Sequence, residues 1–345
     1  MFEDKNPVRT ELEQVGQSKL LQHLGEGLTK QQASSLSSFG DEAIVVKHES
    51  TTSVFSSDLL LENVHFDLTY VPLRHLGYKT VVVGVSRLIA MNVRPSQISL
   101  TLALSNRFSL EAVEELFTGV RLACQRLSID IMGIQTTSSQ SGLCIAISVI
   151  GQADETDIVY SHGGMDKQLL CVSGDLGGAY AGLLILQREK AVFMADPKMQ
   201  PDLQGHEYVV ERQLKPEARV DILDFFKEKG IKPTSMRCID TGLAAAALQL
   251  ARASALGCLL YEDKIPIDHS TYSTMETFDI HPTTTALNGG EDYELLFSIA
   301  QSDYETIKHN ANISVVGHFT EKNSGCMLMP QNGPLIQLRA QEIDY

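Results

Sequence analysis

Hydrophobic and polar residues follow two different rhythms along the chain, and these predict both helices and strands. From Ser109 to Leu127 apolar residues recur at intervals of three and four, which predicts an amphipathic helix with Ser109 as its N-cap. The apolar run 76–90 also predicts a helix, in spite of its β-branched residues. Extended runs at 43–49, 53–61, 97–105, 129–137 and 143–153 predict strands. This order of elements predicts an α+β unit with helices on one face of a sheet.

A polar stretch at 152–168 separates this unit from the rest of the chain, so we predict two domains, 1–152 and 153–345. The second unit begins with an apolar strand, a glycine-rich turn and a helix. It continues with a helix from about Pro216 and an alanine-rich helix at 241–256. Apolar segments near 258–261, 294–299 and 313–318 predict further strands.

Composition narrows the function classes. The 345 residues carry 28 Lys and Arg against 43 Asp and Glu, a formal charge of −15, which argues against non-specific binding to nucleic acid or to an anionic membrane. No apolar stretch is long enough to span a bilayer and the N-terminus does not resemble a signal peptide, so we expect a cytoplasmic protein. The six cysteines lack CxxC spacing, and we expect buried free thiols.

Four segments carry residue types suited to chemistry. Glycines in 173–183, between a strand and a helix, suit an anion, although a tight turn would need them as well. The acids of 39–43 suit Mg²⁺ or a simple turn, and the extended segment 56–67 contains Asp58 and His65. A turn at Asn288-Gly289-Gly290 precedes a group of acids that suits a cation, a metal or a hydroxyl-bearing ligand, namely Glu291, Asp292 and Glu294.

In this order, these segments resemble the thiamine-monophosphate kinase family, whose superfamily includes aminoimidazole ribonucleotide synthetase and selenophosphate synthetase. Particularly similar are SSDLLLENVHFDLTYVPLRHLGYK, CVSGDLGGAY and ALNGGEDYELLF, which look like the version found in Bacteroidetes-type bacteria. The resemblance implies a homodimer whose N-terminal mixed sheets form a barrel, with an α/β C-terminal domain. It also implies that ATP and Mg²⁺ bind between the domains, and that the γ-phosphoryl group of ATP passes to thiamine monophosphate.

The resemblance assigns roles residue by residue but identifies no catalytic residue. The matching positions are Asp41, Glu42, Ser57 and Asp58 for the metal ions, His65, Glu291 and Asp292 for the substrate, and Thr136, Gly174 and Asp240 for the nucleotide. Glu42 stands where the family has a second Asp, and Asp240 where it has a serine.

Other family positions have changed. Where the family has acids, this chain has Arg87, Gln135, Cys238 and Thr241. Val93 and Ile134 are bulkier than the family residues at their positions. Ser161 stands where the family has an arginine, and Ile343 where it has an aromatic residue. Because Mg²⁺ ions beside a triphosphate need several carboxylates, these losses predict a weak or lost kinase reaction. We expect Arg87 to stand where an ion would sit, paired with Asp41 or Asp58 or contacting a phosphate.

Three functions follow from this pattern. The first is a ligand-binding or regulatory relative of thiamine-monophosphate kinase with impaired chemistry. The second is an active ATP-dependent kinase with a reduced metal set, in which Glu42 and Asp240 rebuild part of a metal site. The third is another superfamily reaction on a different phosphorylated or carboxylated substrate.

Overall fold

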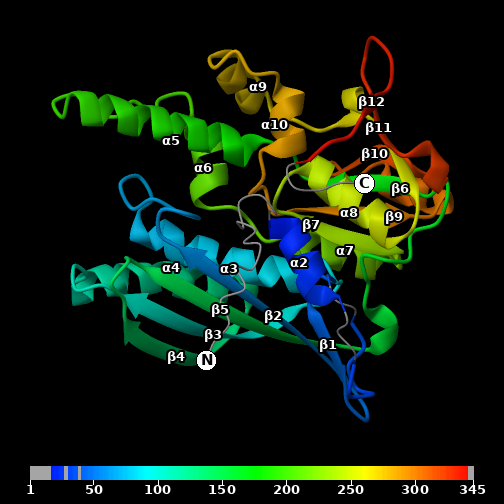
Figure 1. Cartoon of the computed structure of the whole chain (residues 1–345), viewed down its shortest axis with the longest axis horizontal. Coiled ribbons are helices and arrows are strands. Elements are labelled where there is room, and N and C mark those ends of the chain that lie inside the picture. The colour runs from blue at the N-terminus through cyan, green and yellow to red at the C-terminus, as the bar shows by residue number, and fades with distance from the viewer. Residues whose placement is uncertain (1–16, 27–29, 38–39, 341–345) are drawn as a thin grey trace, which may run out of the picture.

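The chain forms two sheets with helices packed against them (Figure 1). The structure is a computed structural model that describes residues 17–26, 30–37 and 40–340. A short helix, α2 (Gln17–Gly25), precedes the first sheet. This arrangement confirms the predicted α+β class; the barrel across a dimer stays a prediction.

The N-terminal sheet has the strand order β1-β2-β5-β3-β4. Its strands are β1 (Ile44–Lys47), β2 (Thr52–Leu61), β3 (Pro95–Leu104), β4 (Asp130–Ser138) and β5 (Cys144–Ala153). Only the β3–β4 pair is parallel within this described sheet, and α4 provides the crossover that parallel strands require. Helices α3 (Leu73–Ile89) and α4 (Leu110–Leu127) lie on one face of the sheet (Figure 1).

Helices α3 and α4 pack closely because glycine faces backbone at two points. A Cβ at Gly77 would lie 2.0 Å from the Leu116 carbonyl oxygen, and one at Gly119 would lie 1.8 Å from the Arg74 carbonyl oxygen. The predicted cap is confirmed, since the Ser109 hydroxyl accepts a hydrogen bond from the Ala112 amide at 3.3 Å. These contacts fix α3 against α4.

The C-terminal sheet has the strand order β12-β11-β8-β10-β6-β9-β7. Its strands are β6 (Leu169–Ser173), β7 (Ser235–Ile239), β8 (Gly257–Tyr261), β9 (Glu294–Ile299), β10 (Ile313–Thr320), β11 (Cys326–Met329) and β12 (Ile336–Gln337). Both faces of β9 are covered, so all its side chains are buried: Phe297 packs edge-on against Phe226, while Leu296 joins the core on the side of α8. That double burial explains why β9 is almost continuously apolar.

Helices surround this second sheet and connect its strands (Figure 1). They are α5 (Gly178–Ala195), α6 (Glu207–Leu214), α7 (Val220–Lys229), α8 (Leu243–Ala253), α9 (His269–Glu276), α10 (Pro282–Asn288) and α11 (Tyr304–Ile307). Short 3₁₀ turns lie at Glu155–Asp157, Glu262–Lys264, Gln301–Asp303 and Lys322–Ser324. No described helix has the length and apolar character needed to cross a bilayer.

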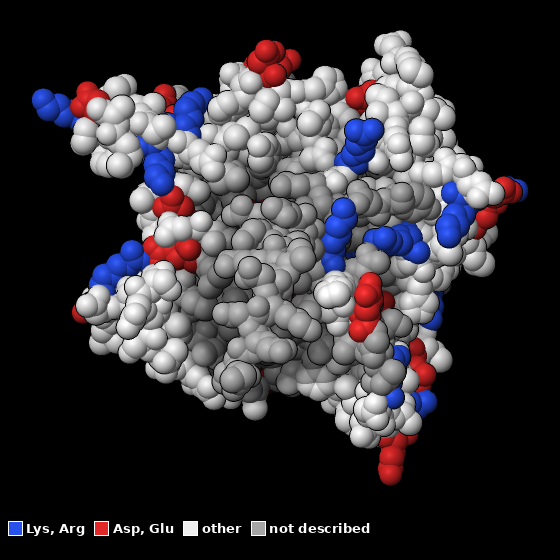
Figure 2. Space-filling model, in the orientation of Figure 1, with Lys and Arg blue, Asp and Glu red and all other residues white. Residues whose placement is uncertain are grey.

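Most predicted elements are confirmed, and the differences have local causes. The helix expected from about Pro216 begins at Val220, because Arg219 keeps a non-helical backbone with φ −85° and ψ 50°. Seven elements escaped prediction: helices α6, α9, α10 and α11 and strands β7, β11 and β12. None of the six cysteines, all of which the structure describes, forms a disulfide bond, and all except the half-buried Cys144 are buried. On the face in Figure 2, several Lys and Arg side chains lie near one another right of centre, and acidic and basic side chains are mixed around the rest of the outline.

Candidate functional site

Two adjacent cavities lie where the halves of the molecule meet. The first, of about 270 Å³, is lined by side chains that include Asp58, His65, Arg87, Asp240 and Glu291. The second, of about 560 Å³, shares His65 and Glu291 with the first; its other lining residues include Phe66, Tyr70, Lys79, Tyr180 and Gln213. Strand β2 and helix α3 supply one wall, and the segments after β7 and α10 supply the other.

The Arg87 guanidinium lies among three carboxylates. Its Nη1 atom is 3.2 Å from Glu42 Oε2 and 3.0 Å from Asp240 Oδ2, and its Nε atom is 3.2 Å from Asp58 Oδ1. These acids come from the segment before β1, from β2 and from the end of β7, so the fold brings them together from distant parts of the sequence. The predicted pairing of Arg87 with Asp58 is confirmed.

A second arginine shares Glu42. Arg237 of β7 places its Nε atom 3.2 Å from Glu42 Oε1 and donates from Nη1 to the Ser161 hydroxyl at 3.2 Å. Ser161 is the position at which the resemblance expected an arginine. The guanidinium of Arg237 therefore reaches the Ser161 position from strand β7. Glu42, whose side chain is only 1 % exposed, is paired with both Arg87 and Arg237.

Burial and charge act in opposite directions on this cluster. Burial by itself would lower the pKa of Arg87, but the charges of Glu42, Asp240 and Asp58 outweigh it and raise that pKa. Burial raises the pKa of Asp58, and Arg87 offsets only part of that effect. Burial also raises the pKa of the Cys238 thiol well above its ordinary value. Arg87 is thus a permanent cation at every accessible pH.

The cluster does not fit a magnesium ion. Mg²⁺ needs near-octahedral oxygen ligands, yet the guanidinium fills the space between the carboxylates of Glu42, Asp58 and Asp240. In the part of the chain that the structure describes, no group of three or more His, Cys, Asp or Glu residues is arranged to hold a metal ion. Two other residues were expected to bind metal. The Oδ1 atom of Asp41 lies 3.9 Å from His162 Nδ1, and the Ser57 hydroxyl is hydrogen-bonded to the Ser148 hydroxyl at 3.3 Å.

His65 presents a defined hydrogen-bonding surface to both cavities. Its Nδ1 atom accepts a hydrogen bond from the Leu61 amide at 3.0 Å. The neutral ring therefore carries its hydrogen on Nε2, which becomes a donor. His65 is thus suited to contact an oxygen or nitrogen acceptor on a bound molecule.

Glu291 is fixed at the shared wall by residues that sequence reasoning missed. Lys79 lies 3.2 Å from its Oε2 atom, and the Gln213 side-chain amide donates to the same oxygen at 2.8 Å. Lys79 also donates to the Gln213 carbonyl at 3.0 Å, and its side chain is only 5 % exposed. Lys79 ends the segment SSDLLLENVHFDLTYVPLRHLGYK, which resembles the family closely, and that position could have marked it as a candidate site residue.

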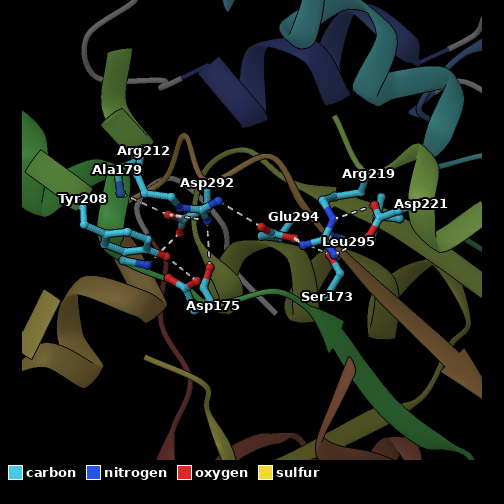
Figure 3. Close-up of polar contacts among 11 residues, drawn as sticks. Ser173, Asp175, Ala179, Tyr208, Arg212, Arg219, Asp221, Asp292, Glu294 and Leu295 are labelled. Atoms are coloured by element: carbon cyan, nitrogen blue, oxygen red, sulfur yellow. Dashed lines mark hydrogen bonds and ion pairs between the residues drawn. The ribbon is translucent and has the colours of Figure 1, made fainter. Parts of the chain in front are cut away.

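The next two acids point away from the cavities into the C-terminal half (Figure 3). Asp292 is fully buried and accepts hydrogen bonds from the Gly177 and Ala179 amides at 2.9 and 3.3 Å, which anchors the start of α5. Burial raises the pKa of Asp292 to about 7 despite the nearby Arg212. Asp292 lines neither cavity, so we keep Glu291 and His65, and not Asp292, in the pocket.

Glu294 is held in the same interior by two arginines (Figure 3). It lies 3.1 Å from Arg212 Nη1 and 2.6 Å from Arg219 Nη1, and it accepts from Ser173 at 2.5 Å. A Cβ at Gly174, which has φ +55°, would lie 2.4 Å from Glu294 Oε1. The glycine is therefore required by this ion-pair cluster, whatever binds near it.

The expected nucleotide residues lie on different elements and have different neighbours. Thr136 is exposed on the edge strand β4, which is separated from β2 by β5 and β3, about 14 Å of sheet. Gly174 adjoins the Glu294 cluster, whereas Asp240 pairs with Arg87. The Ile343 position lies outside the described residues.

Comparison with known proteins gives one consistent assignment. Residues 40–153 match the family described as AIR synthase related protein, N-terminal domain. The chain is 25% identical to the thiamine-monophosphate kinase of Bacillus subtilis over 84% of this chain and 86% of that protein. It is 29% identical to the enzyme of that name from Aquifex aeolicus over 75% of this chain and 79% of that protein.

Solved structures show the same fold. A structure described as AaThiL complexed with AMPPCP and TMP superposes with a TM-score of 0.79 at 24% identity, covering 93% of this chain and 96% of that one. Thiamine monophosphate kinase from Aquifex aeolicus gives a TM-score of 0.75 at 23% identity, over 96% and 100% of the two chains. Together, the domain match, the relatives and the shared fold support membership of the thiamine-monophosphate kinase family.

Proposed function

We propose that this member of the thiamine-monophosphate kinase family keeps a ligand pocket between its halves but transfers phosphoryl groups weakly or not at all. The observation that carries the proposal is the position of Arg87 among Glu42, Asp58 and Asp240. One fixed, singly charged guanidinium takes the place that the resemblance assigns to a divalent ion.

This exchange removes what phosphoryl transfer needs most. The reaction depends on metal ions and other cations that neutralise the phosphates and align the attacking and leaving oxygens. Arg87 cannot supply that charge, because three carboxylates already hold it. A triphosphate brought beside Asp58 and Asp240 would meet negative charge, and the basic residues that line this cavity in the described part of the chain are already paired with acids.

Nucleotide affinity should fall for the same reason. A structural neighbour is described as complexed with AMPPCP and TMP, which supports ATP as the expected cosubstrate of the family. In this chain Thr136 is exposed on β4, Gly174 lies beside Glu294, and Asp240 is paired with Arg87. We therefore infer that the pocket around His65 and Glu291 is the part of the ancestral site that remains.

The proposed assembly is a homodimer, as the resemblance implies, in the cytoplasm. Large apolar side chains are exposed on the first sheet and its edge, among them Ile44, Leu59, Met132 and Ile134. Among the described elements, α3 and α4 cover one face of that sheet (Figure 1), and we infer that a second copy covers the opposite face. Sedimentation is expected to give twice the monomer mass of 37.9 kDa; a stable monomer would contradict the dimer.

The kinase deficit is tested by measuring ADP formation from Mg·ATP and thiamine monophosphate, with the Aquifex aeolicus relative assayed in parallel. We expect turnover at least about 100-fold below that relative, because loss of transition-state charge stabilisation has effects of this size. Turnover within tenfold of the relative would reject the proposal. It would favour the alternative, an active kinase with a reduced metal set in which Arg87 swings aside.

A further inference from the structure

We propose that the two adjacent cavities select a heteroaromatic cation with a free hydroxyl group and discriminate against its phosphate ester. This inference rests on the proposed function and names the ligand class of the same pocket. It follows from the charges that line the cavities, from their aromatic side chains and from the fixed donor at His65.

Every cation on the described cavity walls is already committed. Arg87 and Lys79 are the basic residues that line the two cavities. Arg87 is shared by Glu42, Asp58 and Asp240, while the buried Lys79 is held by Glu291 and by the Gln213 carbonyl. A phosphate group entering either cavity would have to break one of these pairs to find a counter-charge.

The smaller cavity is unfavourable for an anion in its own right. Three acids line it, Asp58, Asp240 and Glu291, whereas the cations beside them are Arg87 and the Lys79 ammonium that pairs with Glu291. A phosphate dianion would therefore lie beside carboxylates of the same sign, and like charges in a partly dehydrated site repel strongly. A cationic ligand meets the opposite situation, because its charge offsets the surplus of acid.

The larger cavity offers surfaces that suit a cationic ring. Phe66, Tyr70 and Tyr180 line it, and aromatic faces attract cations through their quadrupole. Gln213, whose Oε1 atom is buried without a hydrogen-bond partner among the described residues, lines the same wall. An amino group on the ring is favoured near such an acceptor, since a buried acceptor without a donor is destabilising.

His65 accounts for the hydroxyl group. It lies on the boundary between the two cavities, and the Leu61 amide occupies its Nδ1 atom. The remaining Nε2–H donates one hydrogen bond without bringing a full positive charge. This suits a neutral hydroxyl oxygen, whereas a phosphate needs formal cations.

The test is calorimetric titration of the whole chain, in metal-free buffer at low salt, with thiamine and with thiamine monophosphate. We expect a Kd for thiamine at least about tenfold lower than for the monophosphate, the size of effect that an uncompensated like-charge contact produces. Equal affinities, tighter binding of the monophosphate, or binding of neither ligand would each overturn the inference.

A variant tests the electrostatic cause. Asp240→Asn removes one like charge from the wall, and we expect it to raise monophosphate affinity about three- to tenfold while leaving that of thiamine unchanged or lower. Asp263→Asn, at a half-exposed acid paired with Lys264, is the matched control and should change neither affinity. Equal effects of Asp240→Asn on both ligands would count against the inference.

The ADP measurement separates this inference from the proposed function. Tight binding of the monophosphate without turnover overturns the ligand class and leaves the impaired kinase standing. Turnover of the monophosphate at a family rate overturns the proposed function itself.

Discussion

Two clusters in this molecule bring arginines and carboxylates together, and they differ in their surroundings. Around Glu294, the side chains of Arg212 and Arg219 are 13% and 11% exposed, and the cluster connects β6, β9 and α6 (Figure 3). These three residues also line a third cavity, of about 350 Å³. Around Arg87, the arginine is 31% exposed and lines the cavity of about 270 Å³. We infer that the same chemistry stabilises the fold in one place and takes the position of a metal ion in the other.

The largest loss of stability is expected when the charge of the buried Glu294 is removed. Glu294→Gln keeps the size of the side chain but leaves Arg212 and Arg219 without their shared carboxylate, and we expect a loss of about 3–5 kcal/mol in the free energy of unfolding. Urea unfolding followed by circular dichroism measures it.

The matched control lies on the same arginine. Asp221 pairs with Arg219 at 2.9 Å, but its side chain is 51% exposed. Asp221→Asn should change the free energy of unfolding by less than about 1 kcal/mol, because solvent screens an exposed pair. Equal losses in the two variants would show that burial does not distinguish them.

The cavity cluster should respond differently, because an ion can replace its arginine. Arg87→Ala leaves Glu42, Asp58 and Asp240 facing one another, and we expect a loss of about 1–3 kcal/mol, less than at a fully buried pair. Mg²⁺ at tenfold its Kd should restore about 1.4 kcal/mol in the variant. Thermal unfolding with and without Mg²⁺ measures both effects.

The unmodified chain provides the decisive comparison for Arg87→Ala, since its guanidinium fills the site and Mg²⁺ should not raise its unfolding temperature. Arg94→Ala, at a half-exposed arginine paired with Asp224, controls for the loss of a positive charge. A Mg²⁺ effect of equal size in all three proteins would contradict the assigned role of Arg87.

A pH dependence of stability belongs to the interior cluster. Burial raises the pKa of Asp292 to about 7 from an ordinary value near 3.8, so the folded state binds this proton more tightly than the unfolded chain does. The stabilisation is complete below about pH 4 and is lost as the pH rises through 7, with a slope of at most about 1.4 kcal/mol per pH unit. Asp292→Asn should flatten this part of a stability profile measured from pH 5 to 8; an unchanged slope would assign the titration to another group.

The sequence predicted those parts of the fold that depend on local pattern. The helix ending at Leu127 is amphipathic and has its own cap, so both its ends could be placed. Strand β7 was missed because Arg237 interrupts its apolar pattern, and only the tertiary structure shows that this arginine turns toward Glu42.

Only part of the candidate site could be predicted from the sequence. Pairing of Arg87 with Asp58 was one of three outcomes that the resemblance left open, beside pairing with Asp41 and contact with a phosphate. The ion pair between Arg87 and Asp240 was not predicted, since it requires the end of β7 to lie beside the end of α3. Whether Asp292 faces a ligand or the core also depends on backbone direction: Glu291 and Tyr293 both have positive φ, and no motif specifies that.

Lys79 has a consequence for how the molecule moves. It belongs to α3 in the first half, while its acceptors, the Gln213 carbonyl and the Glu291 carboxylate, belong to the second. One ammonium group thus joins the halves at the wall of the ligand cavity. A ligand that draws Glu291 away from Lys79 also loosens this joint, so occupancy of the pocket and the relative orientation of the halves are thermodynamically linked.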